Sequence, residues 1–296
     1  RAIDPDLGRP VAIKLIRTGE DASPAEIDRF VREARITGQL VHPNIPPLHE
    51  FGRTTDGRFF FVMKLVEGRD LGEVLQEMRA GSEPGVHREL LVDLVKVCEA
   101  LSYAHSRKVV HRDLKPENIL VGSFGEVLLM DWGIAKVLGR EEIAVAAPEV
   151  DPGRAGHHTV EGSIIGTPMY MAPEQARGRL DEIDARTDIY SLGTVLYELL
   201  TFRPPFREKS SNALMNAVVK GEFLPPSRRV PEAQIPAELE AAGHKLILGD
   251  VPGLDGLLDA LRGQRPPPGA DVPSEMPLLA SSRSPFEANG ILRSLT

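Results

Sequence analysis

The chain has 296 residues, of which 42% are hydrophobic, and it carries a formal net charge of -8 at pH 7. A chain of this length and composition can bury a substantial core, with room for one large or two small domains. The acidic balance argues against broad nucleic-acid binding, because a phosphate backbone requires a basic face. The single cysteine, Cys98, excludes an internal disulfide framework and a zinc site built from cysteines, and it fits a reducing compartment.

Membrane and export signals are absent from the sequence. No run approaches the ~20 apolar residues of a membrane-spanning helix, and the chain does not open with a charged segment followed by an apolar one. The sequence therefore predicts neither a membrane span nor a signal peptide, and the expected location is the cytoplasm. Because the chain begins at Arg1 rather than Met, we expect it to be a fragment.

Strand-like sequence dominates the first 66 residues. The run at 9–16 is short and rich in β-formers, and the run at 48–66 predicts two strands around a turn at Asp56 and Gly57. One helix is expected between them, because apolar side chains recur with helical spacing at Ile27, Phe30, Val31, Ala34 and Leu40.

The start of this helix is well marked. Ser23 is a preferred N-cap residue, Pro24 suits the first helical position, and Glu26 completes a capping box. The first part of the chain is therefore mostly strand, with one helix.

Helical patterns take over from residue 69. The run at 87–106 places five apolar side chains on one helical face, namely Leu90, Leu94, Val97, Leu101 and Ala104. Two brief strand-like runs bracket a turn at 123–125, and the nearly all-apolar run at 188–200 predicts a buried helix. A helical domain thus follows a sheet domain.

Two segments lack strong periodicity. Residues 139–163 form a long connection of a kind that is usually functional or disordered in compact domains. After about residue 243 the chain becomes rich in proline, and we expect this tail not to pack. His157 and His158 in the first segment suggest a metal site, but without a nearby cysteine or helical spacing a solvated loop pair is favoured.

The polar stretch "HRDLKPEN" at 111–118 is the first candidate for chemistry. It offers a carboxylate at Asp113, an ammonium at Lys115 and an amide at Asn118. A second carboxylate, Asp131, follows the predicted hairpin, which would fold it back beside the first. Asp131 and Asn118 supply hard oxygen ligands that suit Mg²⁺. The combination indicates phosphoryl transfer, which needs cations to neutralise phosphate charge and a carboxylate to orient the attacking hydroxyl.

Six motifs occur in order along the chain: "VAIK" at 11–14, "REAR" at 32–35, "HRDLKPEN" at 111–118, "DWG" at 131–133, "GTPMYMAPE" at 166–174 and "DIYSLG" at 188–193. Each would be ordinary alone. With all six motifs in this order, the chain resembles the eukaryotic-type (Hanks-type) serine/threonine protein kinase family, and among its members it is most similar in style to the bacterial ones.

The resemblance implies an α+β fold of two lobes. A small β-rich N-lobe would cover residues 1–63, a hinge 64–68, and a larger, mainly helical C-lobe 69–242. Residues 243–296 would form a divergent, proline-rich tail. The family's first strand and Gly-rich loop would be lacking from this N-lobe.

The resemblance also assigns the nucleotide and metal contacts. Lys14 would hold the α and β phosphates of ATP and would itself be held by Glu33. Asn118 and Asp131 would bind the metal ions, which would be Mg²⁺, or Mn²⁺ in place of Mg²⁺. The adenine would meet Ala12 above, Leu120 below, Met63 behind, and backbone groups of Lys64 and Val66 at its edge. Asp70 would reach the ribose.

Transfer itself would depend on a second set of residues. Asp113 would accept or orient the proton of the substrate hydroxyl, while Lys115 neutralises the transferred phosphoryl group. Lys115, together with Thr167, matches the serine/threonine branch of the family rather than the tyrosine branch.

Three residues have implied structural roles. His111 would pack in the interior rather than act as a base. Trp132 replaces the usual phenylalanine, and we expect a larger apolar plug beneath the helix of Glu33 rather than altered switching. Asp188 would cap its helix and brace the backbone around His111 and Arg112.

Regulation is implied by the arginine before the catalytic carboxylate. In this family Arg112 would receive a phosphate from the activation segment, and Thr159 and Ser163 are the best-placed acceptors. Such a phosphate would order the long connection at 139–163, which contains several glycines.

Two features depart from the family pattern. The Gly-rich loop that covers the phosphates should precede Lys14, yet Gly8 is the single glycine there, so this loop is missing from the sequence. No "DPxxR" segment follows residue 246, which leaves Glu174 without an identifiable partner.

The sequence thus predicts a serine/threonine protein kinase that transfers the γ-phosphoryl group of ATP to proteins. Expected partners are ATP, protein substrates with Ser or Thr acceptors, and a second copy of the chain for trans-autophosphorylation. The alternative is a pseudokinase or docking module, or an inactive kinase fragment. The surviving polar residues favour the enzyme, and the missing loop favours the alternative.

Overall fold

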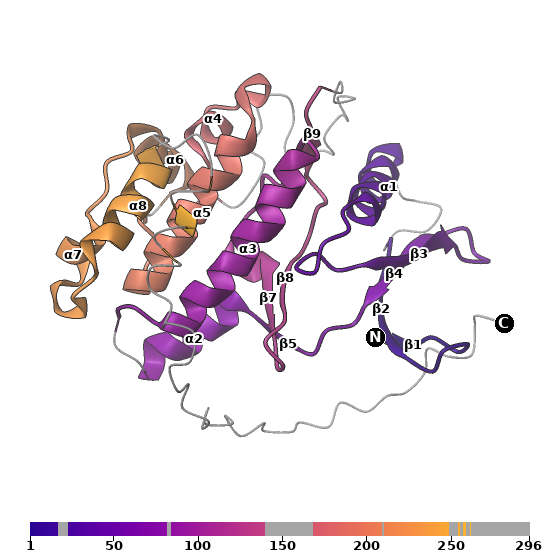
Figure 1. The fold of residues 1–296 in the computed structure, drawn as a ribbon. Coiled ribbons are helices and arrows are strands. Elements are labelled where there is room, and N and C mark those ends of the chain that lie inside the picture. The colour runs from indigo at the N-terminus through magenta and orange to yellow at the C-terminus, as the bar shows by residue number, and fades with distance from the viewer. Residues whose placement is uncertain are drawn as a thin grey trace.

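The computed structural model describes residues 1–16, 23–81, 84–139, 168–208 and 210–248, together with 254, 257, 258 and 261. These residues form a small lobe of one sheet and one helix beside a larger, mainly helical lobe (Figure 1). In this part of the chain no helix combines the length and apolar character needed to cross a membrane.

Four antiparallel strands make the sheet of the small lobe. They are β1 (Ala2–Ile3), β2 (Pro10–Leu15), β3 (Leu48–Arg53) and β4 (Phe59–Lys64), in the spatial order β1-β2-β4-β3. Gly57 adopts a φ of 82° in the turn between β3 and β4, a conformation that favours glycine. The predicted pair of strands around this turn is confirmed. The register places Ala12 opposite Met63 and Lys14 opposite Phe61.

Helix α1 (Pro24–Gln39) packs on this sheet, and its start is the predicted one. Ser23 is the N-cap, and both hydrogen bonds of the capping box with Glu26 are present. Phe30 and Ala34 face the sheet and form a small core with Phe61. This packing fixes which side chains α1 presents to the larger lobe.

A second sheet begins the larger lobe. It contains β5 (Gly68–Asp70), β7 (Ile119–Gly122) and β8 (Val127–Leu129) in that order. Residues 65–67 join β4 of the first sheet to β5 of the second. The predicted hairpin is confirmed, with Ile119 opposite Leu129 and Gly125 at a φ of 81° in the turn.

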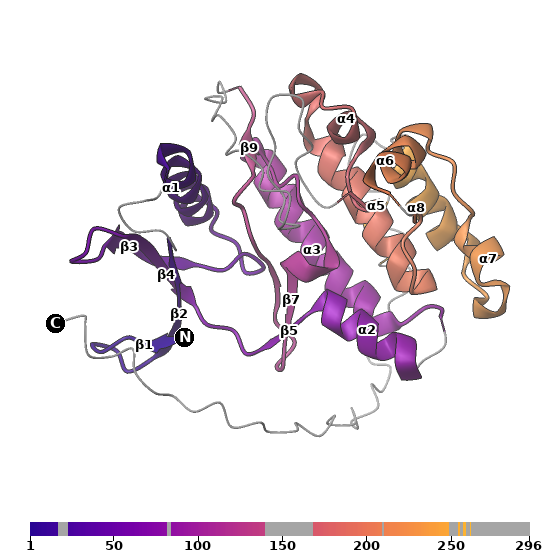
Figure 2. The same ribbon diagram turned by 180° about the vertical axis from the view of Figure 1, so that it is seen from behind.

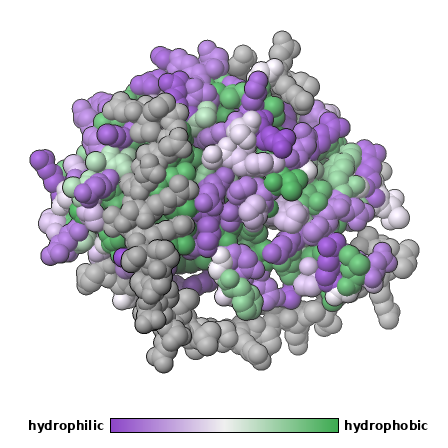
Figure 3. All heavy atoms as spheres, in the orientation of Figure 1, coloured by the Kyte–Doolittle hydropathy of each residue, from purple (hydrophilic) through white to green (hydrophobic). Residues whose placement is uncertain are grey.

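The remaining elements are mostly helical. In chain order they are α2 (Leu71–Gly81), α3 (Arg88–Ser106), β6 (Val109–Val110), η1 (Pro116–Asn118), β9 (Lys136–Val137), α4 (Pro173–Ala176), η2 (Leu180–Glu182), α5 (Ala185–Thr201), α6 (Ser211–Lys220), α7 (Pro226–Arg229), η3 (Pro231–Ala233) and α8 (Ala237–Leu248). Helices α3 and α5 lie side by side in both views (Figures 1 and 2). On the face in Figure 3, hydrophilic side chains surround smaller groups of hydrophobic ones.

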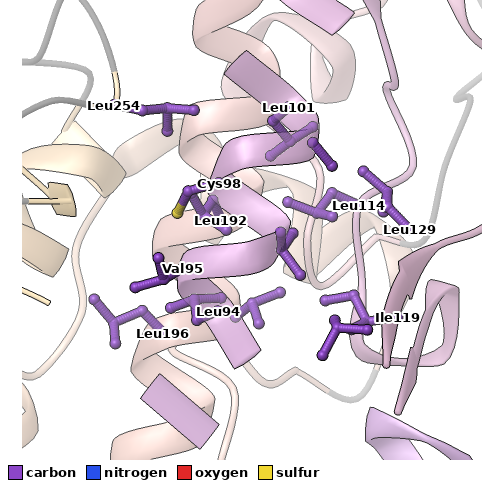
Figure 4. Close-up of a cluster of buried hydrophobic side chains, with 14 of the residues drawn as sticks. Leu94, Val95, Cys98, Leu101, Leu114, Ile119, Leu129, Leu192, Leu196 and Leu254 are labelled. Carbon is purple, nitrogen blue, oxygen red and sulfur yellow. The ribbon is translucent and has the colours of Figure 1, made fainter. Parts of the chain in front are cut away.

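The main core lies between α3 and α5. Every residue of 187–201 is buried, as the apolar run predicts. The predicted face of α3 is buried too, and its side chains meet α5 on one side and Leu114 and Ile119 on the other (Figure 4). The loop that carries the polar motif therefore rests on this main core.

The chain after residue 242 differs from the expectation of an unpacked tail. Helix α8 runs across that boundary to Leu248. Four further side chains are buried in the main core, and Leu254 lies near Leu101 in Figure 4; the four are Leu254, Leu257, Leu258 and Leu261. Their spacing is that of an apolar helical stripe, which the proline-rich composition farther along concealed. The expected start of the tail at residue 243 therefore does not hold for these residues.

Candidate active site

A lysine and a glutamate from the small lobe form the first part of the site. The Nζ atom of Lys14 on β2 lies 2.5 Å from Oε1 of Glu33 on α1. The side chain of Glu33 is 10% exposed. Burial raises the pKa of Glu33, and attraction to Lys14 opposes that rise. The sheet register and the packing of α1 thus bring together the two residues that the sequence pattern pairs.

The second carboxylate of the sequence motifs reaches the same place from the larger lobe. Asp131 lies just after β8, and its Oδ1 is 4.0 Å from Nζ of Lys14. The amide of Gly133 donates to the same oxygen over 3.2 Å. A Cβ atom at residue 133 would lie 3.0 Å from Asp131 Oδ1 and 3.3 Å from Glu33 Oε2. Glycine therefore leaves room for the two carboxylates to approach.

The loop before η1 holds a second polar group. Nζ of Lys115 donates to Oδ2 of Asp113 over 2.8 Å. The amide nitrogen of Asn118 donates to the backbone oxygen of Asp113 over 2.7 Å and to its Oδ2 over 3.1 Å. One carboxylate oxygen is thus held by two donors, which restricts the rotation of the Asp113 side chain.

The hairpin of β7 and β8 joins the two polar groups. The amide of Met130 donates to the backbone oxygen of Asn118 over 2.8 Å, so Asn118 lies beside the residue that precedes Asp131. The Nδ2 atom of Asn118 donates to Asp113, so the Oδ1 atom of Asn118 is the side-chain atom that could bind a metal ion. The amide of Gly133 donates to Oδ1 of Asp131, which leaves the second oxygen of that carboxylate for the same purpose. A carbonyl oxygen and a carboxylate oxygen are ligands that suit Mg²⁺, which typically takes its remaining ligands from phosphate and water.

The backbone of this loop is held by a buried carboxylate. Asp188 on α5 accepts hydrogen bonds from the amides of His111 and Arg112, each over 2.8 Å, and its Oδ2 is 2.7 Å from Nε2 of His105. Burial alone would raise the pKa of Asp188, but the hydrogen bond and charge of His105, with His111, hold it below its ordinary value. No sequence motif pointed to His105, which meets Asp188 only through the packing of α3 on α5.

The expected N-cap role of Asp188 is wrong. Helix α5 begins at Ala185, and its N-cap is Asp184, whose side chain accepts from the amide of Arg186. Asp188 lies in the first turn, where its side chain turns inward to the loop at His111 and Arg112. The apolar run that predicts this helix begins at residue 188, whereas the helix itself starts three residues earlier, at Ala185.

Glu174 has no identifiable partner in the sequence motifs but has one in the structure. The hydroxyl of Thr187 donates to its Oε1 over 2.6 Å. Thr187 is fully buried and directly precedes Asp188. The family pattern predicts an arginine from a late helix at this position, whereas the structure has a threonine hydroxyl on α5.

His111 and Trp132 pack in the interior. His111 is 0% exposed, and its ring meets that of Trp132 in a T-shaped contact with centroids 4.6 Å apart. Trp132 is 1% exposed, shares the main core with Ile36 of α1, and donates from Nε1 to the backbone oxygen of Leu129 over 3.3 Å. The larger ring thus packs in the core beside Ile36 of α1 and makes one hydrogen bond.

The residues expected to meet the adenine come from both sides of the linker at 65–67. Ala12 and Met63 are paired across β2 and β4, while Leu120 and Asp70 are paired across β7 and β5. Lys64 is exposed and Val66 is partly buried. Oδ1 of Asp70 accepts from the amide of Glu73 over 2.9 Å, so this carboxylate also caps the start of α2.

Of the three residues expected to be regulatory, the structure describes Arg112. Arg112 is 5% exposed, and its Nε donates to the backbone oxygen of Ile134. Thr159, Ser163 and Thr167, like His157 and His158, lie outside the described residues.

Replacing Asp188 tests the bracing of the loop. Asp188→Asn replaces one of the two carboxylate oxygens that accept these hydrogen bonds by an NH₂ group. We expect the free energy of unfolding near neutral pH to fall by about 1–3 kcal/mol. Because the folded pKa of Asp188 is lowered, its stabilisation is complete above the unfolded value and is lost as the pH falls through the folded value. Urea unfolding at several pH values should therefore show the difference shrinking below about pH 4. A difference independent of pH would contradict this assignment.

Removing one hydroxyl tests the contact of Glu174. Thr187→Val keeps the shape of the side chain but leaves Glu174 without its donor, and we expect a loss of about 1–2 kcal/mol in the free energy of unfolding. The same change in a Glu174→Ala background should cost less, because the bond is already absent. Equal losses in the two backgrounds would show that the hydrogen bond contributes nothing.

Comparison with known proteins agrees with this geometry. Residues 1–247 match the sequence profile of the protein kinase domain family. A protein named Serine/threonine-protein kinase PknD from Protochlamydia amoebophila is 35% identical over 261 residues, covering 84% of this chain and 26% of that protein. Proteins of the same name from Chlamydia pneumoniae and Chlamydia abortus are 36% and 38% identical, covering 84% and 78% of this chain and 27% and 26% of those proteins.

The chain spans about a quarter of the length of the curated relatives it matches. The family profile, in contrast, covers most of the chain, including β1 and nearly all of α8. On this match, the chain belongs to the protein kinase domain family.

Proposed function

We propose that the chain is a serine/threonine protein kinase, which transfers the γ-phosphoryl group of ATP to serine or threonine hydroxyls of proteins. The observation that carries the proposal is the convergence of Lys14, Glu33 and Asp131 with the group around Asp113. The names of the relatives support the choice of hydroxyl acceptor, as does Lys115 two residues after Asp113. Phosphoryl transfer depends on positioning and on charge neutralisation, and these residue types provide both.

The nucleotide would be held by residues of both lobes. Lys14 would bind phosphate oxygens of ATP, and Glu33 would keep the ammonium in place. Asn118 and Asp131 would hold Mg²⁺, which neutralises phosphate charge when bound. Ala12 and Leu120 come from the two sheets that flank the linker, which fits an adenine held between the lobes.

The acceptor hydroxyl would be oriented by Asp113. Its carboxylate is fixed by Asn118 and Lys115, so it can receive a proton from a hydroxyl at a defined position. Lys115 lies beside that carboxylate and would neutralise the phosphoryl group as it passes to the acceptor. We further propose that a phosphate on Thr159 or Ser163 would engage Arg112, and that a second copy of the chain would supply it.

Asp113→Asn separates transfer from binding. We expect the rate of transfer from labelled ATP to a generic Ser/Thr substrate to fall by about 10²–10⁴-fold. Binding of a fluorescent ATP analogue should change little, because Asp113 faces the hydroxyl rather than the phosphates. Asp6→Asn, in the exposed loop before β2, is the matched control and should retain the parent rate. Near-normal transfer by Asp113→Asn would remove its catalytic role.

Asp131→Asn should affect both steps. Loss of the carboxylate charge removes a metal ligand, so nucleotide binding should require a higher Mg²⁺ concentration, and transfer should fall as well. Titration of Mg²⁺ at fixed nucleotide, in the parent and in Asp131→Asn, measures the change. An unaltered dependence on Mg²⁺ would contradict the proposed metal site.

A further inference from the structure

Gln175 connects two parts of the backbone near the site and has no role in the chemistry described so far. It lies in α4, directly after Glu174, and is 2% exposed. Its Nε2 donates to the backbone oxygen of Arg112 over 2.8 Å, and its Oε1 accepts from the amide of Ala172 over 3.1 Å. The side chain therefore ties the start of α4 to the residue immediately before Asp113.

The peptide group between Arg112 and Asp113 is held at both of its polar atoms. Gln175 binds its carbonyl oxygen, and its N–H, on Asp113, donates to Nδ1 of His111 over 3.3 Å. Nε2 of His111 is 2.9 Å from the backbone oxygen of Met130. A carbonyl can only accept, so Nε2 carries the hydrogen and Nδ1 is left as an acceptor for Asp113. The plane of this peptide is thus fixed from two different elements.

The conformation of Arg112 makes this restraint important. Its φ of 70° lies in the left-handed region, which residues with a side chain seldom adopt unless their surroundings hold them there. Asp188 holds the N–H of Arg112, and Gln175 holds its carbonyl. Release of the carbonyl would allow the peptide to rotate, and that rotation would turn the carboxylate of Asp113.

We propose that Gln175 is a positioning residue, which sets the orientation of Asp113 by holding the carbonyl of Arg112. The inference rests on the proposed kinase function for its catalytic consequence, but the restraint itself is a property of the fold. Placement of Asp113 then depends on the docking of α4, the helix that begins at the end of the "GTPMYMAPE" segment.

Gln175→Glu provides a test in which the chemistry can be reversed by pH. An ionised carboxylate cannot donate to the carbonyl of Arg112, whereas a protonated carboxyl offers one donor and one acceptor, as the amide does. Burial would raise the pKa of the new carboxyl, which brings its protonation within reach of mildly acidic solution. We expect kcat for phosphoryl transfer to fall about tenfold at pH ~8 and to return toward the parent value as the pH is lowered to ~6. The KM for ATP should stay within about twofold of the parent value, because the two backbone groups that Gln175 binds, on Arg112 and Ala172, are not among the residues expected to hold the nucleotide.

Two further variants serve as controls. Gln175→Met keeps the length of the side chain without the donor, so kcat should fall without recovery at low pH. Gln76→Glu makes the same chemical change at an exposed position on α2 and should leave kcat unchanged. Circular dichroism melting would show that each variant is folded. Parent-like kcat in Gln175→Glu at every pH, or the same pH profile in the Glu and Met variants, would overturn the proposal.

A second measurement keeps the inference separate from the kinase proposal. If the parent chain transfers no phosphate, the proposed function fails, and hydrogen exchange decides the role of Gln175. Backbone amides of residues 111–114 should exchange faster in Gln175→Met than in the parent, while those of α1 exchange equally in both. Equal exchange at 111–114 would overturn the positioning role, whatever the activity.

Discussion

The buried carboxylate of Asp188 is the interaction on which the polar site depends. A buried charge is unfavourable unless hydrogen bonds replace the lost water, and His105 and two backbone amides do so here. In return, the amides of His111 and Arg112 are fixed in a conformation that Arg112 would not adopt by itself. The loop that carries Asp113 is therefore anchored on the core formed by α3 and α5, although the loop itself carries charged side chains.

The contact between the two lobes at the site is of a different kind. Lys14 and Asp131 are 4.0 Å apart, but their side chains are 43% and 53% exposed. At that exposure the attraction is screened by water and is worth about 1 kcal/mol or less. Glu33 is buried and binds Lys14 closely, so the small lobe keeps its own pair intact. Between these polar side chains the two lobes are thus joined by a weak attraction, which a bound polyphosphate and its cation would strengthen, while Ile36 and Trp132 share the buried core behind them.

Residue spacing alone predicted those features that local interactions determine, while the family resemblance supplied the contacts of Lys14 with Glu33 and of Asp188 with the loop at Arg112. The capping box at Ser23 and Glu26, the turn at Gly57 and the buried face of α3 all depend on residues a few positions apart. The contacts that it did not predict join distant segments: His105 and Asp188 are 83 residues apart, and Gln175 and Arg112 are 63 apart. Such pairs carry no spacing signal, because only the packing of the helices brings them together.

Among the described residues, Glu174 is bound by a hydroxyl rather than by the arginine that the family pattern predicts. An arginine from a late helix would tie α4 to the end of the chain, whereas Thr187 ties it to the first turn of α5, one residue before Asp188. Gln175, the next residue of α4, binds the same loop that Asp188 braces. Helix α4, the first turn of α5 and the loop of Asp113 therefore form one hydrogen-bonded unit. The described residues after α8 instead join the main core of this lobe through buried leucines.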